Sequence, residues 1–536
     1  MPFVRGRKLL IRDSDRRAYV REQIELIRRS SDEDVHEVII KAGLPDSHDQ
    51  QLVTTVARAL QRRSLSTSPR DVLPIRRELL EEASKRDIPK GRRALAVLKR
   101  SQLEDQSLAA QVARRTERPQ ALRNMREHTL NAMRPLMQSA VIQDSLATEA
   151  GRRRRPADPQ PRAFWTSGSF LVRMKDKELP KLIDTDAADG IEGVYLNRKL
   201  LVPPMVTPKQ LPQSVEDNKV SAWGIRMIGA LAVWGAFGCR GRGIKVGLLD
   251  TGVDATHPDL VGKIAAWAEF DAKGERVLKS TTPHDPDGHG THCAGTIVGG
   301  NAGGRWIGVA PEAEIAAALV ISGAKGGTDA QVLAGIDWAI EQGVDVINMS
   351  LGGLIWGPDV PSTYTSAILN ALRVGIPVVT AIGNEGSQTS GSPGNDLFAF
   401  AVGATDYRSW AAGFSGGRTQ VIRKSPFFPG GSLPLVYSKP DISAPGVAVL
   451  SAAPNGDWRH LNGTSMAAPH VAGAVALLLS ATDIKDVVKP HERAFVIQDL
   501  LTGSAEELGE AGQDHRFGFG RLDVLRAIGF AKDLGY

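Results

Sequence analysis

Three widely separated stretches of the chain place an acid, a histidine and a serine among small residues. Asp250 follows the apolar run Ile244–Leu249 and precedes a Thr-Gly pair. His289 stands in Asp-Gly-His-Gly-Thr-His-Cys-Ala-Gly, and Ser465 stands in Asn-Gly-Thr-Ser-Met-Ala-Ala-Pro-His. A serine nucleophile needs an imidazole and a carboxylate near it. The pattern therefore indicates nucleophilic catalysis by stretches that meet in the fold.

Each group has a defined task in such a site. The Ser465 hydroxyl is a poor nucleophile at neutral pH and needs a base to remove its proton. A histidine suits this task because the pKa of an unperturbed imidazole lies near ambient pH. A carboxylate on the far ring nitrogen fixes the tautomer and stabilises the imidazolium. The small residues around Ser465 let a peptide backbone approach, and a helix that starts there offers N–H groups to a developing negative charge.

Two of the three motifs are ambiguous when taken singly. Asp250-Thr-Gly is also typical of a strand that ends in a turn. His289, His292 and Cys293 suggest a metal site, but the histidines are three residues apart and no further ligand follows at a familiar spacing, which disfavours zinc. The long serine motif rarely arises by chance. Together the three motifs favour catalysis and predict no metal ligand.

The three stretches resemble the signature blocks of the subtilisin-like (subtilase) serine proteases, peptidase family S8, whose chain order is Asp, His, Ser. The resemblance runs from about Trp223 to Ala531. It includes His257-Pro-Asp-Leu, Gly308-Val-Ala-Pro, Asn348-Met-Ser-Leu-Gly-Gly, Gly383-Asn-Glu-Gly and Gly518-Phe-Gly-Arg-Leu-Asp-Val. It implies a serine endopeptidase that hydrolyses peptide bonds through an acyl-enzyme on Ser465.

The resemblance also assigns roles to single residues. The catalytic residues would be Asp250, His289 and Ser465, the oxyanion donors Asn384 and the Ser465 backbone N–H, and the substrate-binding residues Ser350, Leu351, Gly352 and Gly383. Cys293 would lie beneath the active site, as in the proteinase K branch, or serve only as a small buried apolar side chain. Since no acidic cluster marks a preference for basic residues, we expect an apolar or broad preference before the cut.

The same resemblance bears on cofactors. Many relatives hold calcium in the loop that corresponds to residues 301–306, with Asp259 supplying a carboxylate. Here that loop reads Asn-Ala-Gly-Gly-Arg-Trp, so only Asn301 has a side-chain oxygen and Arg305 adds positive charge. Backbone carbonyls remain available as ligands. We expect no required cofactor, and the loop does not support a structural calcium ion.

From Trp223 onward, apolar runs bounded by glycine alternate with helical segments. The runs are 244–249, 315–320, 344–349, 378–382 and 400–402. Strands that are apolar on both faces predict a parallel sheet between two helical layers. The expected fold class is a three-layer subtilisin-like α/β fold with a mainly parallel seven-stranded sheet. A helical N-terminal region and a small α+β propeptide-like segment precede it.

The length of 536 residues predicts more than one domain. Residues 1–150 are interpreted as a helical N-terminal regulatory or interaction region, and a peptidase domain is expected over 222–536. Predicted helices of the first region cover 30–42, 48–63, 71–86 and 118–148. In the first of these, Val35, Val38, Ile39 and Ala42 recur at helical intervals after Ser30-Ser31.

Two linkers, 151–161 and 206–221, flank a short segment at 162–205. The first linker is basic and proline-rich, typical of either a processing site or a charged spacer. The segment itself predicts a strand over 164–174, a helix over 175–188 and a strand over 194–202. Relatives are made with a propeptide that assists folding and blocks the cleft. We therefore interpret the segment, although shorter than usual, as an inhibitory or chaperoning unit of a zymogen-like precursor, cut within about 203–221.

Positive charge is concentrated in the first third of the chain. Residues 1–160 hold 33 Lys+Arg against 22 Asp+Glu, whereas the whole chain has a net charge of +6. Acidic residues are interspersed and aromatic residues do not interleave, so a solvated helical surface is favoured over nucleic-acid binding. The expected partners are polypeptide substrates and a regulatory protein. Two other functions stay open: a catalytically silent peptide-binding scaffold, and binding by the basic region as the main task.

The cysteines and the apolar segments bear on location. Cys239 and Cys293 form no disulfide framework, which permits a reducing compartment. The first residues are basic but no apolar core follows them, unlike in a secretory signal. The apolar stretch Val471–Ala481 is too short for a membrane span. We expect a cytoplasmic protein without a membrane span, and secretion by another route stays open.

Overall fold

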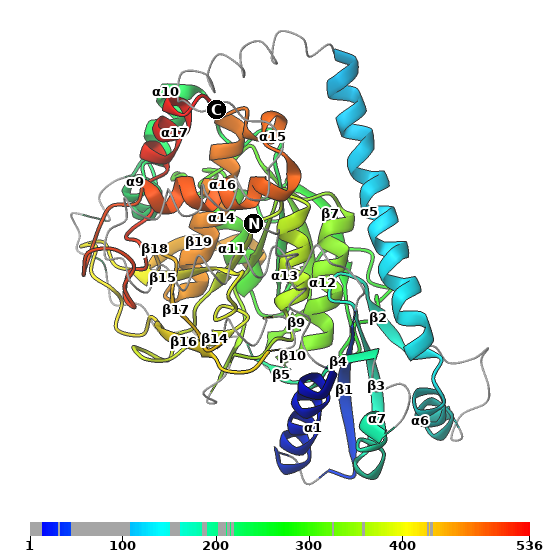
Figure 1. Ribbon diagram of the computed structural model, residues 1–536. Helices are drawn as coiled ribbons and strands as arrows, with labels where there is room; N and C mark the ends of the chain where they lie inside the picture. Colours follow the sequence, from blue (N-terminus) through cyan, green and yellow to red (C-terminus); the bar gives the residue numbers. More distant parts are fainter. Residues whose placement is uncertain are drawn as a thin grey trace, which may run out of the picture.

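The chain forms a large α/β domain and a smaller antiparallel sheet with its own helices (Figure 1). The structure, a computed structural model, describes residues 13–30, 33–43, 108–150, 161–184, 190–201, 211, 215, 219–323, 326–355, 360–425, 428 and 433–536. The helices predicted at 48–63 and 71–86 and most of the two predicted linkers lie outside these residues.

Seven parallel strands form the central sheet of the large domain, in the order β18-β15-β13-β11-β6-β8-β7. They are β6 (Lys245–Asp250), β7 (Ile264–Glu269), β8 (Glu314–Leu319), β11 (Val346–Met349), β13 (Val378–Ala381), β15 (Phe400–Thr405) and β18 (Ile442–Pro445). The five inner strands coincide with the predicted apolar runs, whereas the two edge strands lie outside them. The predicted parallel seven-stranded sheet is confirmed.

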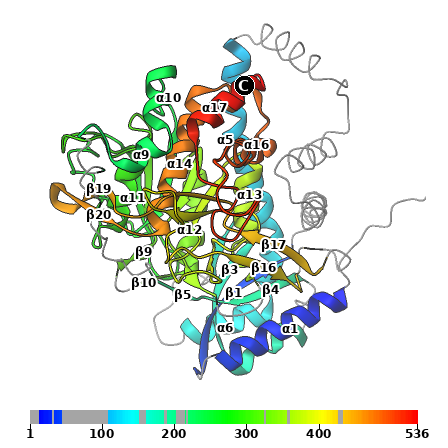
Figure 2. The same ribbon diagram turned by 90° about the vertical axis from the view of Figure 1, so that its left-hand side faces the viewer.

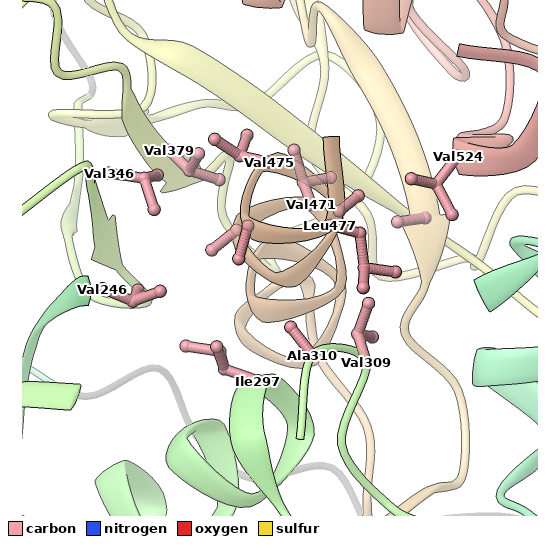
Figure 3. Packing of buried hydrophobic residues seen from close by; sticks show 14 of the residues in the cluster. Val246, Ile297, Val309, Ala310, Val346, Val379, Val471, Val475, Leu477 and Val524 are labelled. Atoms are coloured by element: carbon pink, nitrogen blue, oxygen red, sulfur yellow. The ribbon is translucent and has the colours of Figure 1, made fainter. Parts of the chain in front are cut away.

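Helices cover both faces of this sheet. On one face, α11 (His289–Val298) and α14 (Thr464–Ala481) share a core with alternate strand residues, and Figure 3 shows Val475 of α14 beside Val346 and Val379. The other strand residues pack against α12 (Asp329–Glu341) and α13 (Thr365–Arg373). The three-layer arrangement is therefore confirmed.

Shorter elements complete the large domain. Its further helices are α9 (Trp223–Met227), α10 (Ala230–Phe237), α15 (Ile484–Val487), α16 (Pro490–Gly503) and α17 (Val524–Asp533). Its further strands are β9 (Ile321–Ser322), β10 (Gly326–Thr328), β12 (Gly353–Leu354), β14 (Gly391–Ser392), β16 (Arg418–Ile422), β17 (Leu435–Lys439), β19 (Val449–Ala453) and β20 (Asp457–Leu461).

Among the described residues, α14 is the one helix that is long and apolar enough to cross a membrane, judged by length and composition. Of this 18-residue helix, 94% is buried inside the protein. Figure 3 shows Val471 and Leu477 surrounded by side chains of the sheet and of neighbouring helices. Burial on all sides accounts for its apolar composition.

The small sheet has the strand order β2-β3-β1-β4, and all its neighbours are antiparallel. Its strands are β1 (Val35–Ala42), β2 (Arg162–Phe164), β3 (Ser169–Lys175) and β4 (Ile191–Leu196). The helix predicted over 30–42 is thus wrong over residues 35–42, because these residues form β1. Ile39 faces the large domain while Val38 and Ile40 face the opposite core. A central strand buried on both faces lacks the alternation of apolar and polar residues that marks a strand.

Helices cover the face of the small sheet that points away from the large domain. α1 (Asp13–Ser30) contacts β4 and α6 (Ala140–Ala150) contacts β3 (Figure 2). α7 (Lys181–Asp184) contacts α1. The predicted helix over 118–148 corresponds to α6 and the long α5 (Leu108–Met137). Met133 of α5 is buried in the core of the small sheet, and Met125 packs against the large domain.

The small sheet is therefore built from two distant parts of the chain. Residues 35–42 supply a central strand, and residues 162–196 supply its neighbours on both sides. The predicted segment 162–205 is thus only part of this unit, because a strand that belongs with it lies far upstream. Residues 43–161, with α5 and α6, form an insertion between strands of one sheet.

A turn of the small sheet docks between α12 and α13. The Asp337 carboxylate accepts hydrogen bonds from the Trp165 N–H (3.0 Å), the Thr166 N–H (2.9 Å) and the Thr166 hydroxyl. The Asn370 side-chain N–H donates to the Thr166 carbonyl (2.6 Å). Burial raises the pKa of Asp337 to about 7, although these hydrogen bonds oppose the shift. The turn and the two helices thus share buried hydrogen bonds.

Replacing Asp337 should loosen this contact. Asp337→Ala leaves the two buried N–H groups without an acceptor, at a cost of about 1–3 kcal/mol. Hydrogen exchange measured by mass spectrometry should become roughly tenfold faster over residues 162–175. Glu341→Gln on the same helix is the control, because the Glu341–Arg126 ion pair (3.2 Å) is largely exposed. Unchanged exchange in Asp337→Ala would contradict the importance of this contact.

Candidate active site

The carboxyl edge of the central sheet brings Asp250 and His289 together. Asp250 ends β6, and His289 is the first residue of α11. The His289 Nδ1–H donates to Asp250 Oδ1 at 2.7 Å, and the Thr251 N–H donates to the same oxygen at 2.8 Å. Both side chains are buried. This bond fixes the imidazole tautomer and leaves Nε2 as the nitrogen that can accept a proton.

Ser465 lies at the start of α14, next to Ser350. Its hydroxyl donates to the Ser350 carbonyl at 3.1 Å, and the Ser350 hydroxyl donates back to the Ser465 carbonyl at 2.9 Å. The Cys293 thiol, one turn into α11, also donates to the Ser465 carbonyl at 3.4 Å. In this state the Ser465 hydroxyl thus bonds to Ser350 rather than to His289.

Of the three titratable side chains His289, His292 and Cys293, only His289 is placed to act as a base. Burial alone would lower the pKa of His289, but the neighbouring Asp250 carboxylate outweighs it and holds this pKa well above its usual value. Burial lowers the pKa of His292 to about 3, and burial together with Asp250 raises the pKa of the Cys293 thiol to about 11. His292 and Cys293 are therefore neutral around pH 7.

Asn384 is oriented by the residue before Ser465. Its Oδ1 accepts hydrogen bonds from the Thr464 N–H (2.8 Å) and the Thr464 hydroxyl (2.9 Å). The Nδ2 group is thereby left as a donor, and it lies 3.3 Å from the point where a Cβ on Gly463 would stand. The amide and the start of α14 thus present N–H groups from neighbouring positions, as oxyanion donors do.

The expected substrate-binding residues flank this site. Gly352 forms an isolated antiparallel bridge with Leu201, and Leu351 is buried beside it. The Gly383 N–H donates to the Thr464 hydroxyl at 3.3 Å, which ties that segment to the serine motif. The structure therefore brings the predicted substrate-binding residues together with the predicted triad.

A segment of the small domain contacts these residues through a pairing that the sequence alone did not specify. β5 (Lys199–Leu200) pairs antiparallel with β10, and Leu201 continues to Gly352. The Leu200 side chain is buried, whereas Leu201 is 55% exposed. The chain thus places its own residues against Gly352, one of the predicted substrate-binding residues. An upstream strand pattern at 194–202 was visible in the sequence, but its pairing partner was not.

A buried acid, Asp329, was also missed. It is the first residue of α12, directly after the capping residue Thr328, and is fully buried. Its carboxylate accepts hydrogen bonds from Arg198, which precedes β5. An acid after Gly326-Gly327-Thr328 is also a common helix start, so the sequence alone carried no signal for this contact.

Asp259, the acid of the expected calcium position, is bonded by two protein N–H groups. Asp259 is buried, its Oδ1 accepts the Ala302 N–H at 2.6 Å, and its Oδ2 accepts the Trp458 indole N–H at 2.7 Å. Each carboxylate oxygen thus accepts one protein N–H, and each keeps a second lone pair.

The chain is similar to known proteases. Residues 241–520 match the subtilase family. An intracellular serine protease of Paenibacillus polymyxa is 37% identical over 316 residues, which cover 57% of this chain and 87% of the relative. Subtilisin DY of Bacillus licheniformis is 37% identical over 309 residues (57% and 97%), and the major intracellular serine protease of Bacillus subtilis (strain 168) is 38% identical over 292 residues (53% and 82%).

A buried carboxylate that holds an imidazole beside a serine, at the edge of a parallel sheet, is typical of the serine hydrolases. The match to the subtilase family covers just over half of the chain. It identifies which family of serine hydrolases this is. The chain belongs to the subtilase family. It is a subtilisin-like serine endopeptidase, and polypeptides are its substrates.

The pH dependence of hydrolysis should report His289. Because the Asp250 charge raises the pKa of His289, Asp250→Asn lowers this pKa. The acid limb of kcat/KM should then move to lower pH, while kcat falls by about 10,000-fold because the tautomer is no longer fixed. Peptide hydrolysis measured from about pH 4 to about pH 9 tests this, because histidine titrates within that range. An acid limb at the wild-type pH in Asp250→Asn would contradict the assignment.

Proposed function

We propose that Ser465 is the nucleophile of this endopeptidase, with His289 as its general base and Asp250 orienting the imidazole. The observation that carries the proposal is the buried 2.7 Å bond from His289 to Asp250, beside a serine at a helix start. A structural histidine has no need of a buried carboxyl partner, since burying a charge is costly. In a catalytic site, the carboxylate orients the imidazole and stabilises its protonated form.

The reaction would follow from these positions. The Ser465 hydroxyl turns toward His289 Nε2, gives up its proton, and its oxygen attacks the peptide carbonyl. The oxyanion accepts hydrogen bonds from Asn384 Nδ2 and from the Ser465 N–H. His289 then passes the proton to the leaving amine, which leaves an acyl-enzyme on Ser465. Water, activated by the same imidazole, releases the acid and restores the serine.

We infer further that the full chain is a precursor whose small domain blocks the cleft. Support comes from the pairing of β5 with β10 and of Leu201 with Gly352. The inhibitory unit would comprise residues 13–43 together with 161–201, rather than the segment 162–205 alone. Self-cleavage within about 203–221 would open the cleft. The helical insertion, α5 and α6, is the part available to a regulatory protein.

The location is proposed to be cytoplasmic. Two of the relatives carry the word intracellular in their names, and both cysteines of this chain are free thiols. No cofactor is proposed to be required, and nucleic acid is not proposed as a partner.

A comparison of wild type with Ser465→Ala tests both the nucleophile and the precursor. Wild type should hydrolyse an unfolded polypeptide and acquire a new N-terminus within 203–221, as determined by mass spectrometry. Ser465→Ala should do neither. Asn384→Ala should keep the new N-terminus, formed slowly, with kcat lower by about 100- to 1,000-fold. Full activity from an intact wild-type chain would rule out self-processing, and activity in Ser465→Ala would rule out the nucleophile.

Calcium should not contribute to stability. Because Ala302 and Trp458 already hold Asp259 and Asn301 has the one side-chain oxygen of residues 301–306, we expect EDTA to leave the unfolding temperature unchanged. Trp458→Phe, in contrast, removes the donor to a buried carboxylate oxygen and should destabilise the protein by about 1–3 kcal/mol. Differential scanning calorimetry with EDTA and with added calcium measures both. A lower unfolding temperature in EDTA alone would show that an ion is bound after all.

A further inference from the structure

Arg198, the residue immediately before β5, binds Asp329 of the large domain. Its Nε donates to Asp329 Oδ2 at 2.8 Å and its Nη2 to Asp329 Oδ1 at 3.0 Å, so the guanidinium fork meets both oxygens. The Arg198 N–H also donates to Oδ2 (3.1 Å), and the Asp329 N–H donates to the Arg198 carbonyl (3.1 Å). Asp329 thus binds both the side chain and the backbone of Arg198.

The other contacts of Asp329 come from the large domain. The Tyr364 hydroxyl, just before α13, donates to Asp329 Oδ1 at 2.5 Å. The Asp329 side chain is fully buried, whereas Arg198 is 24% exposed. The start of α12 favours a negative charge at this place. The acid is therefore held by its own domain, and the arginine arrives from the small domain.

The pairing of Leu201 sets the register relative to Ser465. Since Leu201 is opposite Gly352 in an antiparallel bridge, a substrate residue two positions after the one that replaces Leu201 lies opposite Ser350. The Ser350 carbonyl accepts the Ser465 hydroxyl at 3.1 Å. That substrate residue would therefore carry the attacked carbonyl. Counting back, the residue that replaces Arg198 is the sixth before the scissile bond.

We propose that Asp329 is the carboxylate of an acidic subsite that selects a basic side chain at the sixth residue before the scissile bond. Arg198 occupies this subsite in the precursor. The proposal rests on the endopeptidase activity assigned to Ser465 and names the class of substrate that the cleft prefers. A substrate arginine replaces Arg198 and restores the bidentate pair, whereas a neutral side chain leaves a buried carboxylate with Tyr364 as its side-chain donor.

The alternative is that the pair only fastens the small domain to the large one. The two roles differ in what a free peptide substrate should show. A fastening pair affects release of the small domain and leaves peptide preference unchanged. A subsite changes kcat/KM according to the substrate residue, mainly through KM because the contact is remote from the reacting atoms.

The test uses full-length protein, after any maturation that it carries out, and three fluorogenic peptides. One has arginine at the sixth residue before the cut, one has glutamine there, and one has the arginine moved to the fifth residue. The fifth position corresponds to Lys199, whose side chain is exposed. A fluorophosphonate titration counts the active sites in every sample.

We expect kcat/KM about ten- to a hundredfold higher for the first peptide than for the other two. In Asp329→Asn the ratio should fall to about one, and Asp329→Glu should retain part of it. Glu341→Gln, at the far end of α12, should keep the wild-type ratio. Should Asp329→Asn fail to fold, the three peptides with wild type alone still decide the matter.

Two results would overturn the subsite. Equal kcat/KM for the arginine and glutamine peptides in titrated wild type would do so, as would an unchanged ratio in folded Asp329→Asn. If Ser465 takes no label and no peptide is cut, the endopeptidase assignment itself fails and the subsite falls with it. The label therefore separates the two failures.

Discussion

The hydrogen bond between His289 and Asp250 depends on close packing where α11 meets the end of β6. A Cβ on Gly290 would stand 2.1 Å from the Gly252 carbonyl oxygen, so a larger residue there would push the two segments apart. The Gly290 N–H instead donates to the Thr251 hydroxyl at 2.8 Å. Small residues thus let the helix start sit against the strand end, and this contact sets the distance between imidazole and carboxylate.

The large domain and its site could be predicted because the information is local. Each inner strand is an apolar run bounded by glycine, and Asp250, His289 and Ser465 stand in motifs of several residues. The carboxyl ends of parallel strands share one edge, so motifs at those ends had to meet. The orientation of Asn384 by Thr464 could not be predicted, because it depends on side chains 80 residues apart.

The small domain could not be predicted for the opposite reason. β1 is a central strand buried on both faces, and its partners follow only after the insertion at 43–161. Its spacing of apolar residues fits a helix equally well. The role of Asp329 depends on Arg198, 131 residues away, and an acid at a helix start is common without any such partner. Non-local pairings of this kind leave no mark within a short window of sequence.

The contacts between the two domains reinforce one another because they belong to one chain. The turn at Trp165-Thr166, the strand β5 and Arg198 each make a modest contact, but the chain joins them, so each raises the effective concentration of the others. Loss of one of these contacts therefore lowers the effective concentration at which the other two form. The insertion carries α5, whose residues contact both domains. A protein bound to α5 would therefore act on the contact by which the small domain covers Gly352.

The most direct measurement is the reaction of full-length protein with a small fluorophosphonate, followed by mapping of the modified residue. The reagent reports whether one serine is activated by one imidazole, whatever the protein's natural substrate. Our account predicts a single label on Ser465 and its loss in His289→Ala. A label on another residue, or labelling of Ser465 at the same rate without His289, would contradict it.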